Sequence, residues 1–212
     1  MKEQKKHIVF IANPISGTAG KQFVVKLIEE YLDRSRYTYS IATTERVGHA
    51  TELAQKAVRE GADIVCAIGG DGTVNEVANG LVHTQTALAI IPSGSGNGLA
   101  RHLRIPTDPL NAIKILNRGM TQVMDYGIVN GKSFFCTCGV GFDAFISQKF
   151  AESGKRGPVS YLENVLNNSL KYHPETYDVE IVNNKDNEEI HQACKAFLIS
   201  CANASQYGNN AY

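Results

Sequence analysis

A glycine-rich turn with a single acid, Gly69-Gly70-Asp71-Gly72-Thr73, most constrains how this chain can fold. It follows an apolar run, residues 62–68, that is typical of a buried strand, and it opens a segment whose apolar residues recur at helical spacing. Glycines at a strand-to-helix junction let backbone amides and the positive end of the helix approach a phosphate group closely. The turn therefore predicts a nucleotide-phosphate site.

Strand-like and helical patterns alternate along the first part of the chain. Short apolar runs occupy residues 7–12, 37–43, 62–68 and 87–91, and amphipathic stretches lie between them, most clearly at residues 49–59. Strands that alternate with amphipathic helices are typical of a parallel sheet with helices on both faces. We therefore predict an α/β domain with a doubly wound parallel sheet.

The pattern changes in the second part of the chain, where strand-like runs come close together. Residues 121–129 and 132–140 flank Asn130-Gly131, a dipeptide that strongly favours a tight antiparallel hairpin. Residues 177–182 and 191–202 predict a second antiparallel pair across a polar loop. This part of the chain is expected to be mainly antiparallel.

These patterns place a domain boundary near residue 125. Residues 1–125 would form the α/β domain, and residues 126–212 a β-rich domain. The chain ends at residues 204–212 in a loop-like sequence that no further strand follows. We therefore expect the second domain to be incomplete and the chain to be a fragment.

Composition and charge argue against several classes of protein. The 21 basic and 21 acidic side chains cancel, so no net charge attracts the chain to nucleic acid. Five cysteines without a C-x-x-C spacing argue against a disulfide framework or a zinc site and favour reduced thiols in the cytosol. The polar N-terminus lacks the apolar region of a signal peptide, and no segment reaches the length of a membrane span. We expect a cytoplasmic protein.

Two more glycine-rich turns follow strand-like runs. Residues 13–21 come after the first strand, but Gly17 and Gly20 are only three positions apart, so the Walker A spacing is not met. Residues 92–101 follow the fourth strand and do not match the dinucleotide-binding fingerprint. Either turn alone is consistent with an ordinary strand-to-helix connection. Together with residues 69–73 they would meet at the carboxyl edge of one sheet, where such sheets bind ligands.

The three turns, in this order and spacing, resemble those of one known family. The motifs are Asn13-Pro14-x-Ser16-Gly17, Gly69-Gly70-Asp71-Gly72-Thr73-Val74-Asn75-Glu76 and Pro92-Ser93-Gly94-Ser95-Gly96-Asn97. They are similar to the motifs of the diacylglycerol kinase catalytic domain in bacterial lipid kinases and sphingosine kinases. The resemblance covers essentially the whole chain, because that family has an α/β nucleotide domain followed by a β-rich lipid-binding domain.

The resemblance implies an ATP-dependent lipid kinase that transfers the γ-phosphate, with Mg²⁺, to the hydroxyl of a diacylglycerol- or sphingosine-like lipid. The lipid alcohol would be reached by peripheral, transient contact with the membrane surface, and a homodimer is left open. The implied nucleotide-binding residues are Asn13, Pro14, Ile15, Ser16, Gly17, Thr18, Ala19, Thr44, Gly69, Gly70, Asp71, Gly72, Thr73, Val74, Asn75, Gly94, Ser95 and Gly96. Asp71 is also the expected Mg²⁺ ligand, with helix capping as the alternative.

The second domain carries a single site residue in this comparison. Asp143, in Gly141-Phe142-Asp143, resembles an acid at the family's lipid-facing cleft and is expected to contact the lipid, with capping as the alternative. The family's catalytic base lies in an Asp-Gly segment near the C-terminus, and no such segment follows Ala202. No catalytic residue is therefore assigned, and the 212-residue chain is expected to be inactive. The alternatives are an NAD kinase-like enzyme and a non-catalytic nucleotide- or lipid-binding module.

Overall fold

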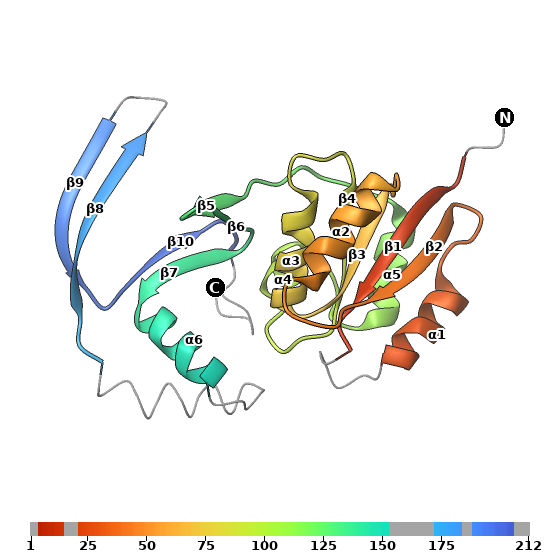
Figure 1. Ribbon diagram of the computed structural model, residues 1–212, viewed down its shortest axis with the longest axis horizontal. Coiled ribbons are helices and arrows are strands. Elements are labelled where there is room, and N and C mark those ends of the chain that lie inside the picture. The colour runs from red at the N-terminus through yellow and green to blue at the C-terminus, as the bar shows by residue number, and fades with distance from the viewer. Residues whose placement is uncertain (1–3, 15–20, 153–171, 184–187, 206–212) are drawn as a thin grey trace. The chain divides into compact units, whose positions relative to one another are not determined.

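The computed structural model describes residues 4–14, 21–152, 172–183 and 188–205. The chain divides into two compact units. One is formed by Met1–Cys136 with Asn203–Tyr212, and the other by Thr137–Ala202. Figure 1 labels their helices and strands in chain order.

The first unit contains a four-stranded parallel sheet with the strand order β2-β1-β3-β4 (Figure 1). The strands are β1 (Lys6–Ala12), β2 (Tyr37–Thr43), β3 (Ile64–Gly69) and β4 (Ala87–Pro92). The helices are α1 (Lys21–Tyr31), α2 (His49–Arg59), α3 (Asp71–Leu81), α4 (Gly98–His102) and α5 (Pro109–Arg118). Strands and helices alternate along the chain as the sequence predicts.

Side chains of the sheet alternate between two buried clusters. On β3, Val65 and Ala67 pack with residues of α2, α3 and α4, whereas Cys66 and Ile68 pack with residues of α1 and α5. Every residue of β3 is buried, as expected for a central strand that is covered on both faces. The unit therefore has three layers with helices on both sides of the sheet, which confirms the predicted doubly wound fold.

Local sequence signals define both ends of α5. The Asp108 carboxylate accepts a hydrogen bond from the Asn111 amide (2.9 Å), and Pro109 occupies the first turn of the helix. Gly119 follows the last turn with a left-handed φ of 65°. A capping acid, a proline at the start and a left-handed glycine after the end are the usual boundaries of a helix. They explain why α5 begins and ends where it does.

The predicted hairpin at Asn130-Gly131 is confirmed. β5 (Gly127–Val129) pairs antiparallel with β6 (Lys132–Phe134), and the two turn residues have φ values of 49° and 74°. Positive φ at both positions is what this tight hairpin turn requires. The paired strands are shorter than the apolar runs around them.

The β5–β6 hairpin lies after the boundary expected near residue 125, but it belongs to the first unit. Tyr126 and Phe135, which flank it, pack with the cluster of α2, α3 and α4. The Asn79 side-chain amide also donates to the Ser133 carbonyl (3.4 Å). These contacts attach residues after 125 to the α/β layers. The domain limit between residues 125 and 126 itself stays a prediction.

The second unit is mainly antiparallel within the described residues. Its elements are β7 (Thr137–Gly141), α6 (Phe142–Glu152), β8 (Glu175–Asn183), β9 (Glu188–Ala196) and β10 (Leu198–Ala202). β8 pairs with β9 as predicted, and β10 pairs with β7.

The single strand predicted over residues 191–202 is wrong, because this run forms β9 and β10 with a break at Phe197. The Phe197 carbonyl accepts a hydrogen bond from the Phe142 amide (2.9 Å), and the two rings pack with their centroids 4.5 Å apart. The chain therefore exchanges one partner strand for another at this residue.

Among the helices of the described ranges, none combines the length and apolar character that a bilayer crossing requires.

Candidate functional site

Two neighbouring strands of the sheet send the chain to opposite faces. β1 leads to α1, which packs with α5 on one face, and β3 leads to α3, which packs with α2 on the other. Adjacent strands whose connections diverge leave a crevice at their carboxyl ends, where open α/β sheets bind ligands. Asn13 follows β1, and the Gly69-Gly70-Asp71 turn ends β3 and begins α3, so two of the predicted turns lie at this switch point of the sheet.

Asn13 connects the end of β1 to the end of β3 and the start of α3. Its amide donates to the Ile68 carbonyl (3.1 Å), and its side-chain amide donates to the Thr73 hydroxyl (3.3 Å). Thr44, just after β2, is buried, and its amide donates to the Ala12 carbonyl (3.0 Å). The structure therefore brings Asn13, Thr44 and Thr73 to the same sheet edge, as the sequence predicts.

The rest of the first turn cannot be placed. Pro14 is exposed, and the predicted contacts that follow it lie outside the described residues: Ile15, Ser16, Gly17, Thr18 and Ala19. Their role in binding a nucleotide stays a prediction.

The second and third turns touch through their backbones. A Cβ atom on Gly94 would lie 2.5 Å from the Gly70 Cα, and one on Gly70 would lie 3.1 Å from the Gly94 Cα. The Ser93 amide also donates to the Gly69 carbonyl (2.8 Å). Such an approach leaves no room for a side chain, which glycine alone lacks. Gly94 is therefore required for the contact between the two turns, and a side chain at Gly70 would be tight against Gly94.

The Asp71 carboxylate joins the second turn to the start of α4. Oδ2 accepts a hydrogen bond from the Asn97 amide (2.8 Å), and Oδ1 accepts one from the Gly98 amide (2.7 Å). Asp71 does not cap its own helix, because Gly70 is the N-cap of α3. It satisfies amides at the start of another helix, which would otherwise lack acceptors. The alternative that Asp71 caps its own helix is therefore wrong, and its carboxylate instead accepts hydrogen bonds at the start of α4.

Asn97 is a site residue that the predicted set omits. It is buried and left-handed, with φ of 53° and ψ of 43°. Its side chain accepts from the Gly94 amide (3.0 Å) and donates to the Gly94 carbonyl (2.7 Å). Asparagine tolerates the left-handed region better than other residues with a side chain. Its place at the end of a glycine-rich turn was the signal that could have identified it.

The start of α3 presents backbone amides to the crevice. The first hydrogen bond of this helix runs from the Val74 amide to the Gly70 carbonyl (3.0 Å). By helix geometry, the amides of Asp71, Gly72 and Thr73 have no acceptor inside the helix, and the positive end of the helix lies there. These three amides fit an anionic ligand. The Val74 amide does not, because it is already used, and its side chain is buried.

Asn75, Ser95 and Gly96 complete the predicted set on these two turns. Asn75, within α3, and Ser95, on the third turn, are exposed. A Cβ atom on Gly96 would lie 2.7 Å from Asp71 Oδ2, so a side chain there would displace this carboxylate oxygen. The Gly96 carbonyl accepts a hydrogen bond from Arg101 Nε (3.0 Å), which brings a cation to the third turn.

The charge of Asp71 also affects the pKa of the Cys136 thiol. Burial raises the pKa of the Cys136 thiol, and the nearby Asp71 carboxylate raises it further. A neutral thiol therefore borders the acid. Within the described residues no three histidine, cysteine, aspartate or glutamate side chains form a metal-binding group. The role of Asp71 as a metal ligand stays a prediction.

Asp143 is the second residue of α6 in the second unit. Its side chain lies outside the described part of the chain. Contact between Asp143 and a lipid therefore stays a prediction.

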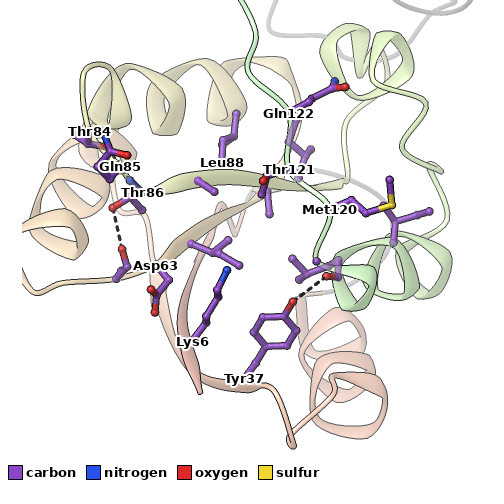
Figure 2. Close-up of a pocket in the computed structure, with 18 of the residues that line it drawn as sticks. Lys6, Tyr37, Asp63, Thr84, Gln85, Thr86, Leu88, Met120, Thr121 and Gln122 are labelled. Atoms are coloured by element: carbon purple, nitrogen blue, oxygen red, sulfur yellow. Dashed lines mark hydrogen bonds between the residues drawn. The ribbon is translucent and has the colours of Figure 1, made fainter. Parts of the chain in front are cut away.

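A cavity of about 820 Å³ lies elsewhere in the first unit (Figure 2). It is lined by the amino ends of the strands, including Lys6, Tyr37 and Asp63, and by the outer edge of β4. Hydrogen bonds across its walls join Thr86 to the Ala62 carbonyl (2.8 Å) and Tyr37 to the Leu116 carbonyl (3.5 Å). None of the three glycine-rich turns contributes to it. Size alone therefore does not identify the candidate site, which lies at the opposite sheet edge.

Comparisons with known proteins agree with this arrangement. The sequence model of the diacylglycerol kinase catalytic domain matches residues 7–129. An uncharacterized protein of Synechocystis is 34% identical over 159 residues, which are 70% of this chain and 36% of that protein. A diacylglycerol kinase of Staphylococcus aureus is 36% identical over 134 residues, 61% of this chain and 42% of that enzyme.

Solved structures show the same fold. A diacylglycerol kinase of Bacillus anthracis superposes with a TM-score of 0.71 at 26% identity. The superposition covers 96% of this chain and 66% of the Bacillus anthracis chain. The chain spans about two fifths of the length of the curated relatives named above. The family match covers more than half of the residues. The chain therefore belongs to the diacylglycerol kinase catalytic domain family.

Proposed function

We propose that this chain is the nucleotide-binding part of an ATP-dependent lipid kinase, which transfers the γ-phosphate to the hydroxyl of a diacylglycerol- or sphingosine-like lipid. The observation that carries the proposal is the joined pair of glycine turns beside the switch point. Gly70 and Gly94 are in backbone contact, and Asp71 holds the start of α4. Membership of the family supports the assignment to kinases that act on lipids.

The phosphates of ATP would bind at the start of α3. Amides without helical acceptors at Asp71, Gly72 and Thr73 offer hydrogen bonds, and the helix end offers a positive potential. The exposed Ser95 hydroxyl on the neighbouring turn adds a donor. Because Asn13, Thr73 and Asp71 are held by hydrogen bonds to other turns, these groups are fixed before the ligand arrives. Fixed donors reduce the entropy cost of binding.

Mg²⁺ fits this site through a single carboxylate. Asp71 is exposed, and an amide occupies only one lone pair on each of its oxygens. Protein-bound magnesium usually takes one or two carboxylates and completes its shell with phosphate oxygens and water. When bound, the ion would neutralise charge on the phosphoryl group during transfer. Asp71 would hold this ion and, at the same time, the start of α4.

The acceptor side of the reaction is proposed for the longer protein. The lipid hydroxyl must lose a proton as it attacks the γ-phosphate, and no described residue is assigned to take that proton. We place Asp143 and the second unit on the lipid side, with transient contact at a membrane surface. Because the chain covers 42% of the matched Staphylococcus aureus kinase, ATP binding is assigned to these 212 residues and turnover to the longer protein.

Labelled ATP tests the proposal. The 212-residue chain and the full-length gene product are each incubated with [γ-³²P]ATP and Mg²⁺, with vesicles that contain diacylglycerol and sphingosine or with NAD. Labelled lipid from the full-length protein and no label from the short chain support the proposal. Labelled NADP would show an NAD kinase instead. If neither protein binds ATP in calorimetry, the nucleotide assignment is wrong.

A further inference from the structure

Two cysteines face each other at the point where the second unit begins and ends. The unit comprises Thr137–Ala202, so β7 is its first strand and β10 its last. These strands pair antiparallel, and the register places Cys138 directly opposite Cys201. Each cysteine is one residue inside the limit of the unit. Any covalent bond between them would close the unit at the position where the chain enters and leaves it.

The backbone geometry brings the two cysteines within reach of each other. The Asn203 amide donates to the Cys136 carbonyl (2.8 Å), and the Phe142 amide donates to the Phe197 carbonyl (2.9 Å). The register alternates, so the pair of Cys138 and Cys201 between them is also a hydrogen-bonded pair. Opposite residues in such pairs have Cα atoms about 5.5 Å apart, inside the range of about 4.4–6.8 Å that disulfides span. Their Cβ atoms lie up to about 5.5 Å apart and must approach to about 4 Å, so the bond would form with local adjustment of the strands and would be readily reduced.

The two thiols already interact and remain accessible. Burial raises the pKa of the Cys138 thiol, and the charge and hydrogen bond of the Cys201 side chain raise it further. Cys138 is half-buried and Cys201 is exposed. An oxidant can therefore reach Cys201 first, and the neighbouring Cys138 lies within contact distance of the modified sulfur.

The other three cysteines lie in different surroundings. Cys66 is buried in the sheet core. Cys136 comes just before β7, and its carbonyl accepts a hydrogen bond from the Asn203 amide. Cys194, on β9, lies opposite Tyr177 on β8.

We propose that Cys138 and Cys201 form a reversible disulfide, which makes the base of the second unit an oxidation-sensitive site. A low-molecular-weight disulfide such as oxidised glutathione is the oxidant. The Cys201 thiolate attacks one of its sulfurs and releases one thiolate, and the Cys138 thiolate then attacks Cys201 and releases the second. Two protein thiols are oxidised to one disulfide, and the oxidant is reduced to two thiols. In a reducing cytosol such a bond would be transient.

The bond would stabilise the second unit. It closes a loop that contains residues 139–200 and so restricts the unfolded chain. Thermal unfolding of the oxidised protein should therefore occur on the order of 5–10 °C above that of the reduced protein. Without the bond, no such redox dependence is expected.

Alkylation in glutathione buffers, followed by peptide mass spectrometry, tests the proposal on the 212-residue chain. In oxidised buffer we expect a cross-linked peptide pair that contains Cys138 and Cys201, while the other cysteines react with the alkylating agent once the chain is denatured for digestion. When the chain is unfolded in urea before it meets the oxidised buffer, the pair should form much less, and glutathione should occupy the two cysteines separately. Cys138→Ser and Cys201→Ser should abolish both the pair and the redox dependence of the melting temperature, and the control Cys194→Ser should preserve both.

Three results would overturn the proposal. They are a bond between another pair of cysteines, glutathione attached to Cys201 without closure of the protein disulfide, and full alkylation of all five thiols in oxidised buffer.

Discussion

Gly94→Ala should separate the two glycine turns that define the candidate site. The new Cβ would lie 2.5 Å from the Gly70 Cα and 3.0 Å from Asn97 Oδ1. Both neighbours are held in place, one in the backbone and the other by two hydrogen bonds to Gly94 itself. Because neither the Gly70 backbone nor the Asn97 side chain is free to swing away, the two turns must move apart.

The cost follows from overpacking. Forcing a methyl group into a closely packed position destabilises a protein by about 1–3 kcal/mol. That free energy corresponds to a roughly 5- to 150-fold faster hydrogen exchange of amides that the turns protect, if exchange occurs by local opening. The amides of Asn97 and Gly98, which donate to Asp71, are the reporters.

Gly72→Ala is the matched control. A Cβ at Gly72 would meet nothing within 4 Å, and its position in α3 favours alanine over glycine. Hydrogen exchange measured by mass spectrometry should be accelerated at the third turn in Gly94→Ala and unchanged or slower in Gly72→Ala. If the two variants exchange alike, the backbone contact does not hold the turns together and the reasoning fails.

Three more outcomes are expected. Asp71→Asn should weaken Mg·ATP binding at least about tenfold in calorimetry, because an amide nitrogen would face a backbone donor. The control Asp108→Asn, which alters only the cap of α5, should leave binding unchanged, and equal losses in both variants would contradict the role of Asp71. Burial raises the pKa of the Cys66 thiol, so iodoacetamide at mildly alkaline pH should modify Cys201 and spare Cys66 until the chain unfolds; equal rates would refute this. The hydrogen bond with Tyr177 raises the pKa of Tyr172 to about 12, so its stabilising effect should be present below about pH 10 and be lost as the pH rises through 12. Ultraviolet titration should show this last tyrosine step move to lower pH in Tyr177→Phe, and an unmoved step would reject that cause.

The sequence predicts those parts of the fold that depend on local signals. The β5–β6 hairpin is predicted from Asn130-Gly131, and the ends of α5 are likewise explained by the local residues Asp108, Pro109 and Gly119. In each case the residues that determine the structure are neighbours along the chain. Periodicity likewise predicts the buried strands of the parallel sheet, because their side chains alternate between two apolar faces.

Contacts between distant residues could not be predicted in the same way. Asp71 lies 26 positions before Asn97, so a search for local capping does not find the helix that it serves. The glycines at 70 and 94 suggested close approach to a phosphate, and the structure adds close approach to each other. The break at Phe197 depends on Phe142, which belongs to a distant part of the sequence. Each feature required the tertiary fold.

Titration of the ¹⁵N-labelled chain with Mg·ATP tests the central claim most directly. If the joined turns bind the phosphates, NMR should show saturable shifts of the Gly70, Asp71, Gly72 and Gly96 amides, while the amides of Asp63 and Thr86 at the amino ends of the strands stay unchanged. Shifts confined to the cavity at the amino ends, or no shifts at millimolar ATP, would contradict the claim.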